Sequence, residues 1–208
     1  NSFFDDVQKD LSRGLYISGF RALLAMGEYI DTKGVYIDDV DNRFEEAMIN
    51  GTVNLQEISV IQNQTFADWA EKIRVQALKI GIDSNISIIN LSLYHVDSWN
   101  VGVSAYVDIR VNDTKGTASF SKVKEIFSTI GIEGFEDPLY LINSNGRVFN
   151  TVVKTDVIDF NNVSQLKRHL NYSFYISSVS APNFMMRLTA NVSKTANGIE
   201  SLVNLNDF

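Results

Sequence analysis

The sequence predicts an α+β fold in which helices come first and an antiparallel sheet second. Apolar residues recur at helical spacing over about residues 1–83, and from residue 84 the spacing changes to twofold alternation. The 208 residues are 45% hydrophobic, enough to bury a sizeable core. We therefore expect a single domain over residues 1–208, with a helical part at about 1–83, a sheet-rich part at about 84–208, and a long N-terminal helix packed on the sheet.

Three helices are expected in the first part of the chain. The first covers about thirty residues and stops at residues 31–34, where Gly34 follows the last helical turn. A shorter helix covers residues 39–49. The third begins after Thr65, because Asp68 stands three residues later and completes a capping box, and it ends at Gly81.

Three neighbouring antiparallel strands are expected next, at residues 86–93, 101–111 and about 116–132. A further hairpin is expected from residues 139–142 and 147–154, because Asn145-Gly146 favours a type I′ turn. A short helix at about 163–170 and a strand at 174–177 complete the expected elements. The fold of the tail from residue 178 to 208 is left open.

Composition and charge narrow the classes of function. The formal net charge of −7 and the lack of a basic stripe argue against nucleic acid as a partner. The absence of cysteine excludes thiolate chemistry and disulfides. No stretch reaches the roughly 20 apolar residues of a membrane helix. Since the chain starts at Asn1 and not at Met, we expect that an N-terminal segment, such as a membrane anchor, has been removed.

Acceptor triplets for N-glycosylation are the strongest functional signal. Roughly three Asn-x-Ser/Thr triplets would be expected by chance in so Asn-rich a chain. Eight are present, and all lack proline at the central position. Their asparagines are Asn50, Asn63, Asn85, Asn90, Asn112, Asn162, Asn171 and Asn191. We expect at least some of them to carry glycans, and the exposed faces of strands would present them.

No catalytic or metal-binding pattern stands out. The two histidines, His95 and His169, lie in different expected elements with no carboxylate or serine at a telling spacing. The acidic cluster at residues 38–46 lacks the glycine and the terminal glutamate of an EF-hand loop, and acidic residues also belong at a helix N-terminus. We therefore expect no catalytic residues, no cofactor and no bound metal.

Three stretches carry a resemblance to a group of uncharacterised archaeal membrane-anchored cell-surface proteins. They are the runs from Gly134 to Ile142, from Ala181 to Arg187 and from Asn197 to Val203. Those proteins have a pilin-like hydrophobic segment before a helix that is similar to residues 10 onward here. The likeness spans nearly the whole chain and implies an outward-facing, membrane-anchored glycoprotein. Its partners would be other surface or filament proteins, or further copies of itself.

A second likeness is to extracellular sensor domains of the Cache or PAS type. There a long helix precedes an antiparallel sheet, and a hairpin resembling residues 137–148 lies beside the ligand. This alternative implies a small-molecule pocket over the sheet, near Tyr106, Tyr140, Asn143 and Arg147.

The leading hypothesis is a non-enzymatic structural, assembly or adhesion module on an archaeal cell surface, attached to the membrane only through a missing N-terminal anchor. The alternative is an extracellular small-molecule sensor or binding domain. An enzyme of unfamiliar type comes third, because an active site on a new fold leaves no trace in one sequence.

Overall fold

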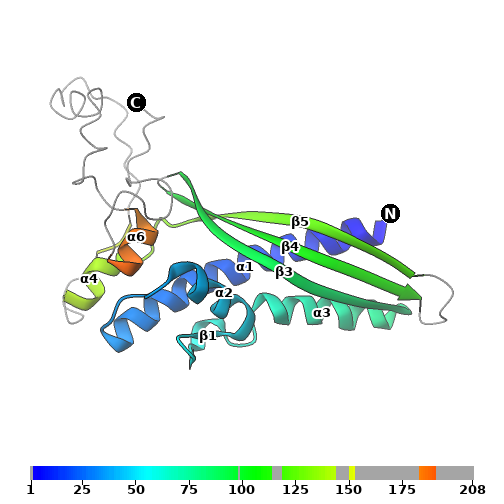
Figure 1. Ribbon diagram of the computed structural model, residues 1–208, viewed down its shortest axis with the longest axis horizontal. Coiled ribbons are helices and arrows are strands. Elements are labelled where there is room, and N and C mark those ends of the chain that lie inside the picture. Colours follow the sequence, from blue (N-terminus) through cyan, green and yellow to red (C-terminus); the bar gives the residue numbers. More distant parts are fainter. Residues whose placement is uncertain (1, 98, 114–118, 144–149, 153–182, 191–208) are drawn as a thin grey trace, which may run out of the picture. The chain divides into compact units, whose positions relative to one another are not determined.

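The chain adopts an α+β structure, as predicted. The computed structural model describes residues 2–97, 99–113, 119–143, 150–152 and 183–190 (Figure 1). The chain divides into two compact units. Unit 1 comprises residues 1–26, 41–93 and 102–130, and unit 2 comprises residues 27–40, 94–101 and 131–208. The single domain over residues 1–208 stays a prediction.

The described residues form several helices and strands. They are α1 (Ser2–Lys33), α2 (Val40–Asn50), β1 (Thr52–Val53), β2 (Gln56–Glu57), η1 (Ser59–Ile61), α3 (Phe66–Lys79), β3 (Ile82–Asp97), β4 (Asn100–Asp113), β5 (Ser119–Gly131), α4 (Pro138–Asn143) and α6 (Phe184–Thr189). The long strands form an antiparallel sheet in the order β3-β4-β5. Among these described helices, none combines the length and apolarity needed to cross a membrane.

The ends of α1 and α3 lie close to where the sequence predicts them. Gly34 follows α1 with φ +66°, and its N–H donates to the carbonyl oxygen of Ile30 at 2.9 Å. At the start of α3 the Thr65 hydroxyl accepts from the N–H of Asp68 at 3.0 Å. The Asp68 carboxylate accepts from the N–H of Thr65 at 2.9 Å in return. The predicted capping box is therefore present, and it satisfies backbone donors that the helix leaves without partners.

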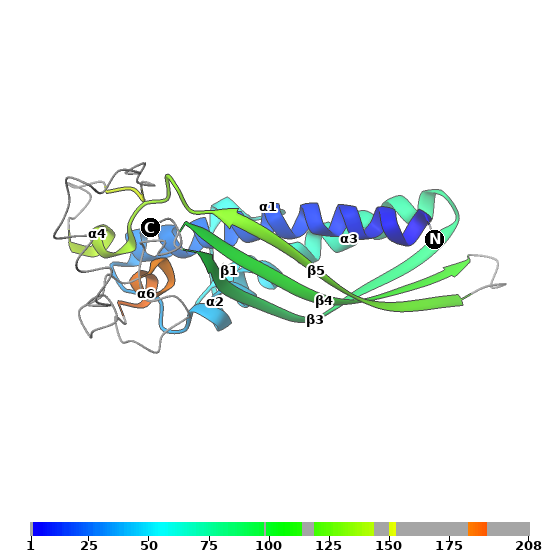
Figure 2. The ribbon, with the colours of Figure 1, turned by 90° about the horizontal axis from the view of Figure 1, so that it is seen from above.

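In unit 1 the helices pack on one face of the sheet (Figures 1 and 2). Every second residue of β4 points into this layer, as the twofold pattern predicts. The inward residues of β4 within unit 1 that are completely buried are Val103, Ala105, Val107 and Ile109. On β3 the burial pattern shifts by one residue where Ile89 and Asn90 are both exposed, which indicates a β-bulge at that point.

Two glycines let α1 approach its neighbours closely. A Cβ atom at Gly14 would lie 2.9 Å from Cγ of Trp69 on α3. A Cβ atom at Gly19 would lie 2.8 Å from Cδ1 of Ile130 on β5. A hydrogen bond of 2.9 Å from the Ser128 hydroxyl to the carbonyl oxygen of Ser12 adds a polar contact between β5 and α1. A side chain at Gly14 would meet the base of the Trp69 side chain and push α1 and α3 apart, whereas one at Gly19 would require the tip of Ile130 to move.

In unit 2 the prediction of a strand at residues 139–142 is wrong, because these residues belong to helix α4. The Asp137 carboxylate accepts from the N–H of Leu139 at 3.1 Å, and Pro138 takes the first helical position. Proline suits that position because its fixed φ is helical and its missing N–H would have had no partner. A short apolar run fits a strand or a helix equally well, so the capping residues decide. The expected Asn145-Gly146 turn lies outside the described residues.

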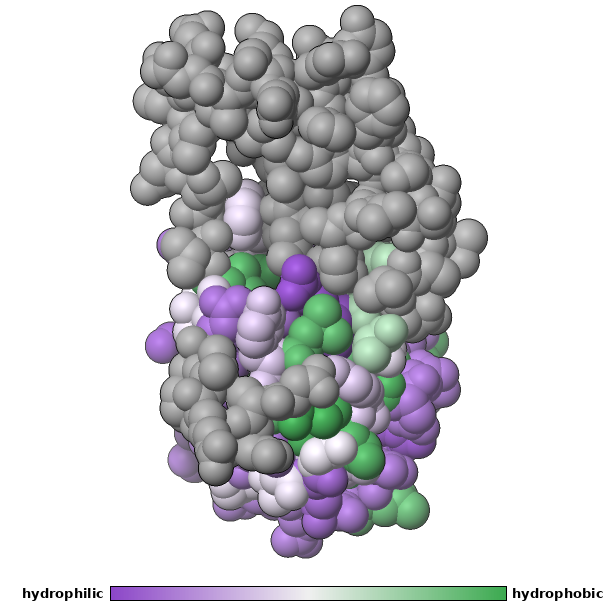
Figure 3. Space-filling view, turned by 90° about the vertical axis from the view of Figure 1, so that its left-hand side faces the viewer, coloured by the Kyte–Doolittle hydropathy of each residue, from purple (hydrophilic) through white to green (hydrophobic). Residues whose placement is uncertain are grey.

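Helix α6, in the tail that the sequence left open, is also capped by its preceding residue. Asn183 is fully buried, and its Oδ1 accepts from the N–H of Met186 at 2.8 Å. The first residue of α6, Phe184, packs edge to face against Phe135, with the ring centroids 5.7 Å apart. Seen from the left-hand side of Figure 1, the described residues present hydrophobic and hydrophilic side chains next to one another (Figure 3). The expected elements at residues 163–170 and 174–177 lie outside the described residues.

Replacing Gly27 by alanine is expected to raise the free energy of unfolding by about 0.5–1 kcal/mol, because glycine inside a helix costs about that much relative to alanine. No described atom lies within 4 Å of the position its Cβ would take. Gly14→Ala is the matched control, since its Cβ would meet Trp69, and it should be less stable than Gly27→Ala. Urea denaturation measures both, and a Gly27→Ala chain no more stable than Gly14→Ala would contradict the expectation.

Candidate functional site

The asparagines of all five sequons within the described residues are exposed. They are Asn50, Asn63, Asn85, Asn90 and Asn112. Asn85 and Asn90 lie on β3, an edge strand of the sheet, and Asn112 lies near the end of β4. The other three candidates, Asn162, Asn171 and Asn191, lie outside the described residues. Every sequon asparagine that the structure describes is therefore exposed enough to carry a glycan.

The hydroxyl groups of these sequons differ in their surroundings. In the sequon of Asn50, the Thr52 hydroxyl donates to the Glu46 carboxylate at 2.7 Å. In the sequon of Asn63, the Thr65 hydroxyl is buried within the cap of α3. On β3, by contrast, Ser87 is exposed, and the Ser92 hydroxyl accepts from the side-chain amide of Asn90 itself at 3.3 Å. The folded protein therefore leaves the two sequons of β3 more accessible than those of Asn50 and Asn63.

The four residues expected to line a ligand pocket are not shown to form one. Tyr106 lies on the outward face of β4 and is 41% exposed. Its hydroxyl bonds the Glu125 carboxylate, and this hydrogen bond raises the pKa of Tyr106. Tyr140 lies on α4 in the other unit, so it belongs to a helix and not to the expected strand. The side chain of Asn143 and the whole of Arg147 lie outside the described residues, so this pocket stays a prediction.

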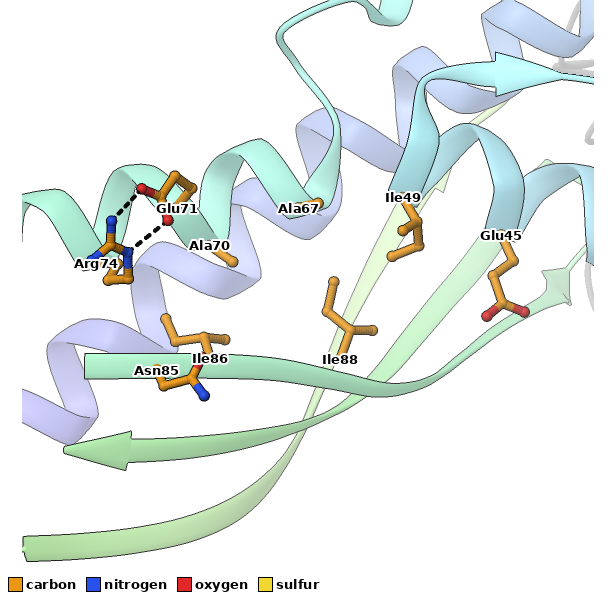
Figure 4. Close-up of a pocket in the computed structure, with 9 residues that line it drawn as sticks. All are labelled: Glu45, Ile49, Ala67, Ala70, Glu71, Arg74, Asn85, Ile86 and Ile88. Atoms are coloured by element: carbon orange, nitrogen blue, oxygen red, sulfur yellow. Dashed lines mark hydrogen bonds and ion pairs between the residues drawn. The ribbon is translucent and has the colours of Figure 1, made fainter. Parts of the chain in front are cut away.

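A hollow of about 380 Å³ lies in unit 1, between α2, α3 and β3 (Figure 4). Its lining residues are Glu45, Ile49, Ala67, Ala70, Glu71, Arg74, Asn85, Ile86 and Ile88. Figure 4 shows an apolar middle around Ile49 and Ile88, with Arg74 and Glu71 at one end and Glu45 at the other. The volume is in the range of small-molecule sites, and the mixed lining suits a molecule with both polar and apolar parts.

The charges at the end of this hollow are already paired. Arg74 makes two hydrogen bonds of 2.7 Å to the Glu71 carboxylate, one from Nε and one from Nη2. The hydrogen bond from Arg74 lowers the pKa of Glu71. Both side chains are exposed, so the pair adds little stability.

Asn85 belongs to the hollow and to a sequon at the same time. Asparagine-linked glycans are bulky. Figure 4 shows that the side chain of Asn85 points away from Ile86 and α3, on the other side of β3. A glycan on Asn85 would therefore extend away from the hollow and leave it open.

The histidines and the acidic cluster are the other residues that the sequence analysis considered. His95 is buried on β3, and His169 lies outside the described residues. Asp41, from the acidic cluster, lies in the first turn of α2, where a carboxylate favours the helix dipole. In the part of the chain that the structure describes, no group of three or more acidic or histidine side chains could hold a metal ion. The absence of metal, cofactor and catalytic residues stays a prediction.

The β1–β2 hairpin is a feature that the sequence analysis missed. Val53 pairs with Gln56 across a two-residue turn, and the turn residues Asn54 and Leu55 have φ of +52° and +61°. These angles define a type I′ turn, in which glycine is usual at the second position. A leucine there costs roughly 1–2 kcal/mol in backbone strain. Leu55 is nevertheless 87% exposed, so its side chain recovers little of that cost by burial.

The carboxylate of Glu46 on α2 holds this turn in place. It accepts from the N–H groups of Leu55 at 2.6 Å and Asn54 at 3.1 Å, from the Thr52 hydroxyl at 2.7 Å and from Arg43 at 2.6 Å. Burial by itself would raise the pKa of Glu46, but these four hydrogen bonds together outweigh it and hold the pKa below its ordinary value. The ionised carboxylate therefore stabilises the turn conformation.

Glu46→Gln is expected to lower the free energy of unfolding at neutral pH by about 1–3 kcal/mol, because the amide nitrogen of glutamine would face donors and leave them without an acceptor. Since the folded pKa is depressed, the advantage of Glu46 is complete above the ordinary glutamate pKa of about 4.3. It is lost as the pH falls through the lower folded pKa.

Urea denaturation of both proteins from pH 7 to pH 3 measures this difference. Glu71→Gln serves as the control, because Glu71 is exposed and its replacement should change stability much less. A difference between the parent and Glu46→Gln that does not shrink on acidification would contradict the role of the carboxylate.

No family model, no curated protein and no solved structure significantly matches the chain. The resemblance to archaeal surface proteins therefore rests on the sequence runs quoted above. Any function suggested by the exposed sequons and by the hollow beside β3 is therefore a proposal.

Proposed function

We propose that this chain is a non-enzymatic structural, assembly or adhesion module, displayed on the cell surface by a membrane-anchored archaeal protein and modified with N-linked glycans. The observation that carries the proposal is the exposure of every sequon asparagine in the described residues. Exposed acceptors in such excess are typical of proteins that leave the cytoplasm. The archaeal source and the anchor come from the resemblance of the sequence runs.

The placement of two sequons on β3 supports this proposal. β3 is an edge strand, and edge strands expose unpaired backbone groups that can recruit other chains. Glycans on Asn85 and Asn90 would stand along this strand and block such unwanted pairing. A protein crowded with others on a cell surface would benefit from this protection.

Glycopeptide mapping of the protein purified from its native membranes tests the proposal. We expect sugar masses at Asn85 and Asn90 on β3 and lower occupancy at Asn50 and Asn63, because the hydroxyls of Thr52 and Thr65 are engaged in the fold. Equal occupancy at all four sites would show that modification precedes folding, while still supporting surface display. A chain without sugars, recovered from the cytoplasm, would overturn the proposal.

The hollow beside β3 favours one alternative, a module that binds a small molecule in the extracellular space. Its volume of about 380 Å³ and its paired arginine fit a small anionic ligand. The side chain of Asn85 points away from the hollow (Figure 4), so a glycan on Asn85 is compatible with this alternative.

For the alternative, a thermal-shift screen with small carboxylates should give at least one stabilising compound. A ligand at one hundred times its Kd stabilises the folded state by about 2.7 kcal/mol. The shift should be lost in Arg74→Ala and kept in Arg110→Ala, which removes an exposed arginine of β4 outside the hollow. A screen without stabilising compounds, or equal loss in both variants, would reject the alternative.

A further inference from the structure

Asn50 is followed by Gly51, and an asparagine in this position is chemically labile in an unfolded chain. The backbone nitrogen of Gly51 can attack the side-chain carbon Cγ of Asn50. A new N–Cγ bond forms, the Cγ–Nδ2 bond breaks, and the side-chain nitrogen leaves as ammonia with the proton of the Gly51 N–H. Water then opens the resulting imide ring to aspartate or isoaspartate. Glycine favours this reaction because it has no side chain to hinder the attack.

The folded chain holds the backbone of these two residues in a conformation that opposes the attack. Asn50 is the last residue of α2, and closing the ring requires a rotation that takes its backbone out of the helical region. The N–H of Gly51 donates to the carbonyl oxygen of Ala47 at 3.1 Å. Gly51 has φ +70°, the left-handed conformation in which many helices end. The attacking nitrogen is therefore engaged in the end of the helix.

The neighbours of Gly51 hold this conformation as well. Gly51 is buried, although Asn50 is exposed. The carbonyl oxygen of Gly51 accepts from Nε2 of Gln62 at 3.0 Å and from the N–H of Ile58 at 3.5 Å. A Cβ atom at Gly51 would lie 3.2 Å from Cγ2 of Thr65, so this part of the backbone has little room to rotate. The reaction therefore requires local unfolding of the end of α2.

We propose that the fold protects Asn50 from deamidation, and that unfolding of this segment allows Asn50 to convert to aspartate or isoaspartate. The conversion removes the nitrogen to which an N-linked glycan would be attached, so it also destroys the sequon. We expect low glycan occupancy at Asn50, because the Thr52 hydroxyl bonds the Glu46 carboxylate. In chains without this glycan, the folded backbone preserves the asparagine.

The converted chain is expected to refold less well than the parent. Aspartate places a negative charge at the C-terminal end of α2, where the helix dipole disfavours it. Isoaspartate adds a carbon atom to the main chain before Gly51, which displaces the N–H group that bonds Ala47. Unfolding of this segment therefore becomes irreversible once the ring has formed.

Peptide mapping by mass spectrometry tests the proposal on the purified chain, produced without glycans. The chain is incubated in mildly alkaline buffer, with and without denaturing guanidinium chloride, and conversion of Asn50 is quantified. We expect conversion to be slower by about tenfold or more in the folded chain, because it waits for local opening. In denaturant, Asn145 and Asn197, which also precede glycine, should react as fast as Asn50 and serve as internal standards. Equal rates at Asn50 with and without denaturant would overturn the proposal.

Two glutamine variants show whether the contacts of Gly51 give the protection. Gln62→Ala removes the hydrogen bond to the Gly51 carbonyl oxygen and should speed conversion of Asn50 in the folded chain by about threefold to tenfold. Gln76→Ala is the matched control, since it removes an exposed glutamine of α3 and should leave the rate unchanged. Urea denaturation confirms that each variant folds. An unchanged rate in Gln62→Ala, or the same increase in both variants, would contradict the proposal.

Discussion

The packing of α1 against the buried face of β4 organises unit 1. Val103, Ala105, Val107 and Ile109 of β4 are completely buried, and covering such an apolar face with a helix stabilises the sheet in water. Gly14 and Gly19 bring α1 close enough to touch α3 and β5 directly. Because the helices cover one face of the sheet, the strand residues on the other face remain on the surface, and the sequons of β3 are among them.

The same arrangement places two concave surfaces on unit 1, and they differ in chemistry. The hollow beside β3 combines an apolar middle with the charged pair of Arg74 and Glu71. A second hollow, on α1, is lined by Tyr16, Ile17, Phe20, Arg21, Leu24 and Val60. It is almost wholly apolar, because Arg21 is held by a backbone carbonyl. The first suits a small molecule with both polar and apolar parts, and the second offers an apolar surface.

The β1–β2 hairpin shows how the protein uses a charged group to hold a local conformation. Four donors converge on the Glu46 carboxylate, and they include both N–H groups of the strained turn. Partial burial of a carboxylate is unfavourable by itself, and these hydrogen bonds offset that cost. The result is a rigid exposed leucine, beside an otherwise ordinary packed core of helices and sheet.

The sequence by itself determined the elements whose signals are local and repeated. Such signals are the cap at Thr65, the glycines after α1 and α3 and the alternation along β4. The alternation of apolar and polar residues along β3 likewise places its sequons on an outward face. Only the tertiary structure decided the helix at residues 138–143, where a short apolar run is ambiguous. It alone showed the Leu55 turn and both hollows, because their residues come from separate elements. No periodicity predicts that the Glu46 carboxylate accepts from the N–H groups of a turn eight and nine residues further along the chain, since such contacts form only when the chain is packed.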